Sequence, residues 1–165
     1  MRRYGMSLLV AFAVFTFSAS RANALCLLCS CSLSSGGINF STYDPLLAAN
    51  TNVTGNIRVT CGVLSGLVAL GVSYGIQLSA GGSGSFTTRQ LSKGASKLNY
   101  NLYVDSARTT VWGDGSGATQ TVDAAYTVAL GAATYQDYTV YGRVPMLQNV
   151  AAGAYTDSLV VTINY

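Results

Sequence analysis

The sequence predicts an all-β protein with the fold of an immunoglobulin-like sandwich, and three observations support this. Several segments alternate between apolar and polar residues, as strands do when one face is buried and the other faces water. Clusters of glycine, serine and aspartate separate these segments at short intervals. No window of useful length carries the 3.6-residue period of an amphipathic helix. Many short strands joined by turns are typical of two packed sheets.

Each predicted strand carries an apolar side chain at every second position or nearly so. The turn clusters that end these strands lie at residues 35–37, 80–85, 113–117 and 151–153. The chain contains no internal repeat and no linker that would divide the domain. The apolar positions, strand by strand, are Val53, Ile57, Val59 and Cys61; Val72, Tyr74, Ile76 and Leu78; Leu98, Tyr100, Leu102 and Val104; Tyr126, Val128 and Leu130; and Tyr138, Val140 and Val144.

The last predicted strand, residues 157–165, keeps an apolar face up to its end. Leu159, Val161, Ile163 and Tyr165 share this face. An ordinary sandwich would add a turn and a further strand after it. The pattern therefore predicts either an exposed apolar edge or a central strand that earlier segments pair on both sides.

Residues 1–24 have the three parts of a secretory signal peptide. Two arginines come first, an apolar run extends from Leu8 to Phe17, and small residues lead up to Ala24. The apolar run is shorter than the roughly 20 residues that a membrane-spanning helix needs. We therefore expect cleavage after Ala24 and one exported domain over residues 25–165, without a transmembrane segment.

Loss of the signal would leave the domain electrically neutral. The full sequence has nine lysines and arginines against six aspartates and glutamates, a net charge of +3. Three of the nine basic residues, Arg2, Arg3 and Arg21, lie within the signal. The remaining domain carries six charges of each sign, so it has no basic surface of the kind that binds nucleic acid.

Three of the four cysteines fall in the segment CLLCSCS, residues 26–32. In an exported protein an even number of cysteines is expected to form disulfides. A zinc site is disfavoured because separated ligand pairs and histidine are absent. Four cysteines allow three pairings. We favour Cys31 with Cys61, which joins the first strand to the end of the next, and Cys26 with Cys29 as a small second loop.

Most residues of acid–base catalysis are missing. The sequence has no histidine and no glutamate, so a Ser-His-Asp triad cannot be built and a cysteine nucleophile would lack its usual partner. The segment GDGSG at 113–117 lacks the further carboxylates of a calcium loop and the lysine of a phosphate loop, and is predicted to be a turn. We expect no catalytic residues, no metal site and no cofactor.

An apolar segment, VLSGLVALGV, covers residues 63–72 directly after Cys61 and its neighbour. It either extends a strand or forms a buried loop, as apolar runs usually do. The alternative is an exposed loop that contacts hydrophobic surfaces, because large exposed apolar patches are often binding sites. The residues of this possible contact loop are Val63, Leu64, Leu67, Val68 and Leu70.

Seven segments are distributed in order over nearly the whole of residues 25–165. They are CSLSSGGINFSTYDPL (31–46), TGNIRVTC (54–61), YGIQLSAGGSG (74–84), LNYNLYVD (98–105), TTVWGDGSG (109–117), VYGRVP (140–145) and GAYTDSLVVTINY (153–165). Together they resemble the spore coat protein U domain family, which includes the pilins of archaic, Csu-type chaperone–usher pili. The combination of segments is specific, whereas each one alone would be weak.

The resemblance implies an immunoglobulin-like fold that lacks its final strand. In such pilins a periplasmic chaperone lends a strand to the open groove, and an outer-membrane usher helps to exchange it for the N-terminal extension of the next subunit. Leu159, Val161, Ile163 and Tyr165 would then line one side of the acceptor groove. Tyr43 would pack near the exit of the first strand. The implied partners are a periplasmic pilus chaperone, an outer-membrane usher and other pilin subunits.

The N-terminal segment departs from the family pattern. A donor strand needs on the order of ten residues before the first conserved cysteine, whereas only Leu25 to Ser30 would precede Cys31 after the predicted cleavage. Cleavage near Ala19 or Ser20 would add a few residues. We therefore hypothesise a minor or end-located subunit that accepts a strand and donates none.

The sequence thus favours a structural and adhesive fimbrial subunit that is exported through the periplasm to the cell surface. Such a subunit would serve surface attachment and biofilm formation. The alternative is a free-standing secreted β-sandwich, such as a coat or surface-binding protein, that closes its own edge and does not polymerise.

Overall fold

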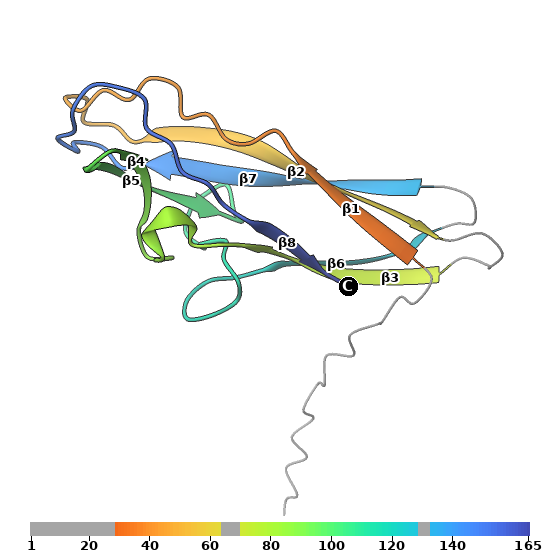
Figure 1. Cartoon of the computed structure of the whole chain (residues 1–165). Coiled ribbons are helices and arrows are strands. Elements are labelled where there is room, and N and C mark those ends of the chain that lie inside the picture. Colours follow the sequence, from red (N-terminus) through yellow and green to blue (C-terminus); the bar gives the residue numbers. More distant parts are fainter. Residues whose placement is uncertain (1–28, 64–69, 129–132) are drawn as a thin grey trace, which may run out of the picture.

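A computed structural model of the protein describes residues 29–63, 70–128 and 133–165, which form a two-layered β-sandwich (Figure 1). The all-β prediction is confirmed. None of the helices in these ranges is long and apolar enough to cross a membrane. The strands are β1 (Cys29–Ser35), β2 (Thr51–Val63), β3 (Leu70–Leu78), β4 (Arg89–Lys93), β5 (Ser96–Tyr103), β6 (Val122–Val128), β7 (Ala133–Val144) and β8 (Val161–Asn164), with a short 3₁₀ helix η1 (Gly81–Ser83) after β3.

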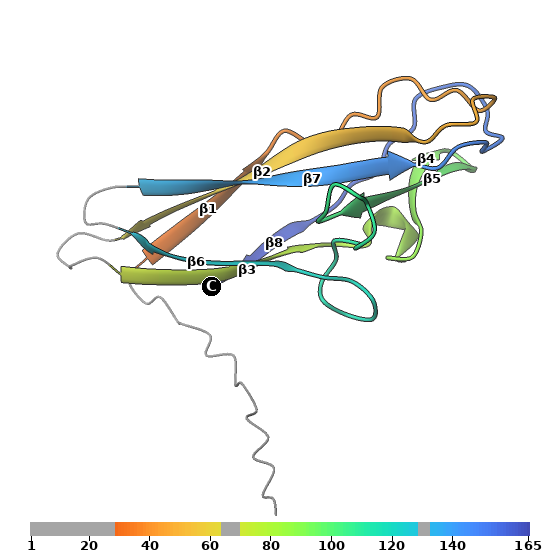
Figure 2. The same cartoon turned by 180° about the vertical axis from the view of Figure 1, so that it is seen from behind.

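Two antiparallel sheets make up the sandwich. The larger sheet has the strand order β1-β2-β7-β5-β4, and the smaller has the order β6-β3-β8. The longest ladder joins β2 to β7, from Thr51 opposite Val144 to Gly62 opposite Ala133. Seen from behind, the two sheets again lie one above the other (Figure 2). Strands β1 and β8 are edge strands, one in each sheet.

The core lies between the sheets and is built from the alternating apolar positions. Leu130, one of the predicted apolar positions, lies outside the described residues. Val53, Val104, Tyr126 and Tyr138 are half-buried and pack against the core. The other predicted positions are buried, which confirms the alternation as a signal for the inward face. The buried apolar residues are Phe40, Ile57, Val59, Cys61, Val72, Tyr74, Ile76, Leu78, Leu98, Tyr100, Leu102, Trp112, Val128, Val140 and Val144.

One strand departs from the expected division into an apolar inner face and a polar outer face. The alternation places Asn101 on the water-facing side of β5, yet its side chain is only 6% exposed. The side chain of Arg89 on β4 covers it and donates a hydrogen bond from Nη1 to Asn101 Oδ1 at 2.6 Å. The Asn101 amide in turn donates to the carbonyl oxygen of Phe86. The prediction fails at Asn101 because buried polar groups that satisfy each other leave no trace in an apolar–polar pattern.

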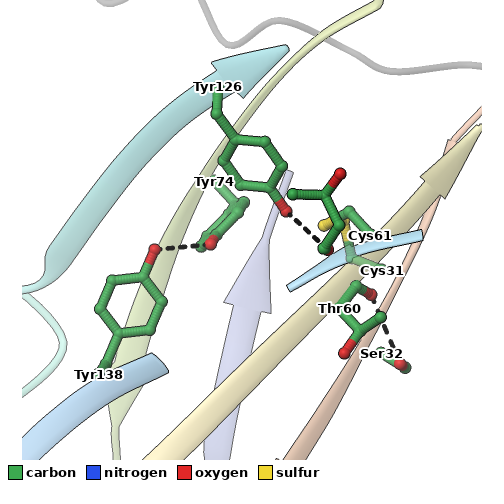
Figure 3. The surroundings of a disulfide bond; sticks show 8 residues. Cys31, Ser32, Thr60, Cys61, Tyr74, Tyr126 and Tyr138 are labelled. Atoms are coloured by element: carbon green, nitrogen blue, oxygen red, sulfur yellow. Dashed lines mark hydrogen bonds between the residues drawn. A yellow bond between two sulfur atoms is a disulfide. The ribbon is translucent and has the colours of Figure 1, made fainter. Parts of the chain in front are cut away.

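The disulfide between Cys31 and Cys61 joins two residues that lie directly opposite each other on β1 and β2. This predicted pairing is confirmed. Cys29 also belongs to a disulfide, and the predicted pairing with Cys26 involves a residue outside the described ranges. Figure 3 shows the confirmed bond near a group of tyrosines that connect the sheets. There the hydroxyl groups of Tyr74 on β3 and Tyr138 on β7 hydrogen-bond at 2.6 Å.

The C-terminal segment crosses from the larger sheet to the smaller one before β8 begins. Thr156 exchanges two main-chain hydrogen bonds with Ser92 at the outer edge of β4. Four residues later, the Ser79 amide donates a hydrogen bond to the carbonyl oxygen of Val160, and the Val160 amide donates one to the Ser79 hydroxyl oxygen. This crossing places the C-terminal segment along the side of the sandwich where both sheets have an edge.

Asp157 fixes the middle of this crossing. Its carboxylate accepts hydrogen bonds from the Tyr100 hydroxyl at 2.7 Å and from the amide of Gly82 at 2.8 Å. The neighbouring Gly81 has φ of +69°, and a Cβ atom there would collide with the same carboxylate. Glycine is therefore required at Gly81 for both its backbone conformation and the close approach of Asp157.

Candidate functional site

The two edge strands lie on the same side of the sandwich. Strand β1 pairs with β2 and strand β8 pairs with β3, and the described residues form no ladder between β1 and β8. Both strands lie on the side that faces the viewer in Figure 1 and faces away in Figure 2. An edge strand has one row of main-chain N–H and C=O groups without a strand partner. This side of the sandwich can therefore pair with a further strand.

A cavity of about 310 Å³ opens between these edges, and we call it the edge groove. One wall is formed by Ser35, at the end of β1, and by Ile38 just after it. Leu159 and Val161 of the C-terminal segment form the opposite wall. The floor consists of core residues from both sheets, namely Ile57, Leu78, Tyr100, Leu102 and Val140. The floor residues are almost fully buried, whereas the wall residues Ile38, Leu159 and Val161 are only half-buried and face the open groove.

The edge groove continues toward the end of the sandwich where β4 and β5 meet. A second cavity of about 570 Å³ shares Ile38, Phe40 and Leu91 with the first. It runs between residues 38–45 and residues 150–155, which are irregular segments before β2 and after β7. The two cavities together form one channel along the open side. An extended chain segment has the shape that fits such a channel.

Asp157 and Asn56 are two of the polar residues that line the edge groove. The Asp157 carboxylate lies at its rim, bonded to Tyr100 as described above. Burial, followed by the hydrogen bond to Asp157, raises the pKa of the Tyr100 hydroxyl above its usual range. On the outer side, Asn56 donates to Asp137 Oδ1 at 3.0 Å. Both polar groups already have partners in the chain, so the groove presents a mainly apolar lining to whatever binds there.

The structure brings some of the predicted groove residues together and leaves others apart. Leu159 and Val161 line the edge groove. Ile163 lies opposite Ile76 on β3 and is half-buried against the core, on the same face of β8 as Val161. Tyr165 follows the end of β8 and is 43% exposed.

The wall of the edge groove that faces Leu159 and Val161 was not predicted from the sequence. It is formed by the segment after β1, around Ile38 and Phe40, and by Leu91 on β4. In the segment INF, residues 38–40, two apolar residues alternate with a polar one, and this pattern could have predicted that Ile38 and Phe40 face inward. Tyr43 lines the second cavity, and its hydroxyl accepts a hydrogen bond from the amide of Gln148 at 2.7 Å.

A family model described as the Spore Coat Protein U domain matches residues 13–162. The chain belongs to the Spore Coat Protein U domain family. The resemblance seen in the sequence is thereby confirmed. A curated member of similar sequence is Protein U of Myxococcus xanthus, which is 34% identical over 146 residues, covering 82% of this chain and 77% of that protein.

The fold of this Spore Coat Protein U domain is also similar to one in a solved complex. That complex is the CsuC–CsuE chaperone–tip adhesion subunit pre-assembly complex from archaic chaperone–usher Csu pili of Acinetobacter baumannii. The TM-score is 0.54 at 19% sequence identity, over 84% of this chain. The chain spans 40% of the length of the chain that it matches. At this identity the likeness shows a shared fold.

Beside the groove, the outer face of the larger sheet in this family member carries an ion pair. Arg58 on β2 lies opposite Asp137 on β7, and its Nε and Nη2 donate to the two carboxylate oxygens at 2.7 and 2.6 Å. These bonds, with the one from Asn56, lower the pKa of Asp137 to about 2. The guanidinium of Arg58 also lies over the ring of Tyr135. The pair fixes β2 against β7 next to the outer rim of the groove.

The two other segments identified in the sequence are the predicted turn at residues 113–117 and the possible contact loop after Cys61. The segment at 113–117 is a turn, in which Asp114 Oδ1 accepts the amide and the hydroxyl of Ser116. Among the described residues, no three aspartate or cysteine side chains lie close enough to hold a metal ion. Of the possible contact loop, residues 64–69 lie outside the described ranges, while Val63 ends β2 and Leu70 begins β3.

Proposed function

We propose that the chain is a structural subunit of a chaperone–usher pilus and that its edge groove accepts a β-strand from another chain. A periplasmic chaperone supplies this strand first, and a second pilin subunit replaces it during assembly at an outer-membrane usher. The assembled fibre is displayed at the cell surface, where it serves attachment and biofilm formation. The proposal includes export under the signal at residues 1–24.

The observation that carries this proposal is the edge groove. Its floor consists of core residues from both sheets, and its two walls lie where the edge strand β1 ends and where the edge strand β8 begins. In β-strand addition, main-chain hydrogen bonds to an edge supply affinity, and alternate side chains fill pockets along the groove. An added strand with apolar residues at every second position would cover the half-buried side chains of Ile38, Leu159 and Val161. The likeness in fold to a chain of a chaperone–subunit complex also supports this proposal.

The proposal also covers the place of the subunit in the fibre. A subunit with few residues before Cys31 accepts a strand and donates none, and so belongs at an end of the fibre or among its minor components. This part rests on the predicted cleavage after Ala24. Sequencing of the mature N-terminus tests it, and a start well before Leu25 would contradict it.

The main experiment is expression of the full chain in a bacterial periplasm, with and without a chaperone encoded beside it. We expect the chain to be degraded when alone and to copurify with the chaperone in a one-to-one complex. The physical reason is that the open groove leaves its apolar walls, Ile38, Leu159 and Val161, only half-buried and leaves the edges of β1 and β8 without a strand partner until another strand covers them.

A matched pair of extended chains makes the experiment independent of the chaperone. The first carries, after Tyr165, a flexible linker and a strand with valine at alternate positions. The second carries the same extension with serine in place of valine. We expect the first to unfold at a higher temperature than the unextended chain, and the second to unfold at the same temperature as it. A stable monomer that neither the chaperone nor the valine strand affects would favour the free-standing secreted protein instead.

A further inference from the structure

The outer face of the smaller sheet has a hollow at its centre, on the side away from the core. Gly75 lies in the middle strand β3, opposite Asp123 on β6 and opposite Asn164 on β8. These three residues form one row across the sheet. Because Gly75 has no side chain, the surface of the sheet is hollow at the centre of this row. The carboxylate of Asp123 and the amide of Asn164 lie on either side of the hollow.

The loop between β5 and β6 closes one end of this hollow. Its residue Gly113 accepts a hydrogen bond from the amide of Leu78, and donates one to the carbonyl oxygen of Gln120. The side chain of Gln77 on β3 donates to the carbonyl oxygen of Asp114 at 3.3 Å. Figures 1 and 2 both show this loop projecting near β3 and β6. The result is a cavity of about 610 Å³, which we call the polar notch.

The lining of the polar notch is almost entirely made of hydrogen-bonding groups. Among the described residues that line it, none is a lysine, an arginine or an aromatic residue. The side chains that line it are the carboxylates of Asp114 and Asp123, the amides of Gln77, Gln120 and Asn164, and the hydroxyls of Thr119 and Thr121.

The chemistry of this lining restricts the class of ligand. Two carboxylates without a basic residue disfavour phosphorylated, sulfated or acidic ligands. Hydrogen bonds from Ser116 lower the pKa of Asp114, so this carboxylate is ionised at neutral pH. An apolar ligand would remove water from these polar side chains without offering them hydrogen bonds, which costs free energy. Carboxylates accept hydrogen bonds and amides both donate and accept them, so together they match the hydroxyl groups of an uncharged sugar.

Gly75 is the residue that makes the notch possible. An ideal Cβ atom at Gly75 would lie 2.8 Å from Asp123 Oδ1, closer than such atoms approach without movement. The carboxylate of Asp123 therefore leans over the glycine. A glycine inside a strand weakens the strand, and often marks a place where a ligand approaches the backbone closely. Gly71, on the same face of the same strand, would have open space around an added Cβ.

We propose that the polar notch binds an uncharged glycan, whose hydroxyl groups hydrogen-bond to Asp123, Asn164 and Gln77 over the floor at Gly75. The notch lies on the face of β3 that points away from the core, whereas the edge groove opens into the core. A strand in the groove leaves the notch open. Glycan binding thus goes beyond the proposed assembly function and does not depend on it.

The test uses the full chain purified from the periplasm, together with its chaperone where the two copurify. The probes are glucose, galactose, mannose, N-acetylglucosamine and their β-linked disaccharides, with N-acetylneuraminic acid as the acidic comparison. Saturation-transfer NMR detects binding, and titration calorimetry measures the dissociation constant. We expect at least one uncharged sugar to bind and the acidic sugar not to bind.

Three variants locate the site. Gly75→Ala displaces the Asp123 carboxylate, and Asp123→Asn replaces one of its acceptor oxygens by a donor at constant shape. Each should weaken binding at least tenfold. Gly71→Ala makes the same chemical change on the same strand outside the notch, and should alter the dissociation constant less than twofold. Equal melting temperatures and equal chaperone recovery for the three variants would separate a lost contact from a lost fold.

Three results would overturn the proposal. They are failure of every uncharged sugar to bind, binding of the acidic sugar alone, and binding that Gly75→Ala and Asp123→Asn leave unchanged. None of these results bears on whether the edge groove accepts a strand, because that property is measured separately with the extended chains.

Discussion

Arg89 donates a hydrogen bond from Nη2 to the carbonyl oxygen of Trp112 at 2.7 Å, and neither side chain is exposed to solvent. The same guanidinium donates from Nε and Nη2 to the carbonyl oxygen of Ser79, and from Nη1 to Asn101. Burial lowers the pKa of Arg89 from its ordinary value, yet a guanidinium stays protonated in proteins. A buried positive charge is thus surrounded by neutral oxygens from three separate segments of the chain.

We expect Arg89→Lys to lower the free energy of unfolding by about 2–4 kcal/mol. A lysine ammonium places its donors at one point, so it cannot reach the oxygens of Ser79, Asn101 and Trp112 together. At least one buried oxygen would be left without a partner. Urea denaturation of the full chain measures the effect. Arg143→Lys is the control, because Arg143 donates to Asn52 at the sheet surface. Its expected loss is below about 1 kcal/mol, and equal losses for the two variants would contradict this account.

The burial of Arg89 and Asn101 shows where sequence reasoning reaches its limit for the fold. Alternation correctly predicted the inward faces of β2, β3, β5 and β7, because a half-buried strand imposes a period of two on its side chains. Strand β4, with the sequence RQLSK, has no such pattern and was not predicted. Its buried arginine is stabilised by oxygens that are distant in sequence. Only the assembled fold brings these groups together.

For a similar reason, only one of the two walls of the edge groove could be predicted from the sequence. Leu159 and Val161 were identified because they belong to one alternating strand at the end of the chain. The facing wall comes from Ile38, in an irregular segment, and from Leu91 on the unpredicted strand. Which side of the sandwich stays open depends on how the C-terminal segment crosses between the sheets. That crossing is fixed by Asp157 and its partners, whose pairing no local pattern reveals.

The ion pair between Arg58 and Asp137 should make stability depend on pH in an acidic window. The pKa of Asp137 is lowered from 3.8 to about 2, first of all by the hydrogen bond from Arg58. A carboxyl group with a lowered pKa in the folded state stabilises the fold above its unfolded pKa, and loses this effect as the pH falls through the folded pKa. The contribution should therefore be complete above pH 3.8 and decline from there toward pH 2.

The melting temperatures of the native chain and of Asp137→Asn measure this dependence. We expect their difference to be constant at neutral and mildly acidic pH, and to shrink as the pH falls from 3.8 to 2. Added salt should reduce the difference, because both side chains are partly exposed, with relative exposures of 45% for Arg58 and 38% for Asp137. A difference that stays unchanged across this window would show that the pair does not act through the charge of Asp137.

The disulfide should hold the edge strand β1 in place. It closes a loop with a sequence separation of 30 between Cys31 and Cys61, and a loop of this size is worth about 3–4 kcal/mol in the chain-entropy model. We expect the double variant Cys31→Ala, Cys61→Ala to lose stability on this scale. Hydrogen exchange should show faster exchange of the β1 amides than of the β7 amides, because β7 is paired on both sides. Uniform loss of protection in both strands would contradict a local role for the bond.

Two neighbouring valines offer a sharp test of the edge groove. Val161 lines the groove, whereas Val160 points outward and is 65% exposed. Valine and threonine have nearly the same shape, so Val161→Thr places one hydroxyl group in the apolar lining with little change in volume. An added strand would bury that hydroxyl, and a buried hydroxyl without a partner costs about 1–3 kcal/mol. We expect Val161→Thr to weaken binding of the chaperone or of a donor-strand peptide by roughly 5- to 150-fold on that cost.

Val160→Thr is the matched control, because it makes the same change one residue away on the opposite face. Its hydroxyl stays in water whether or not a strand occupies the groove, so the dissociation constant should stay within about twofold of the native value. Fluorescence titration with a labelled strand peptide compares the two variants directly. If both variants weaken binding equally, the added strand does not lie against Val161, and the groove between β1 and β8 is not where it binds. If only Val161→Thr weakens binding, the bound strand covers the apolar wall that Val161 shares with Leu159.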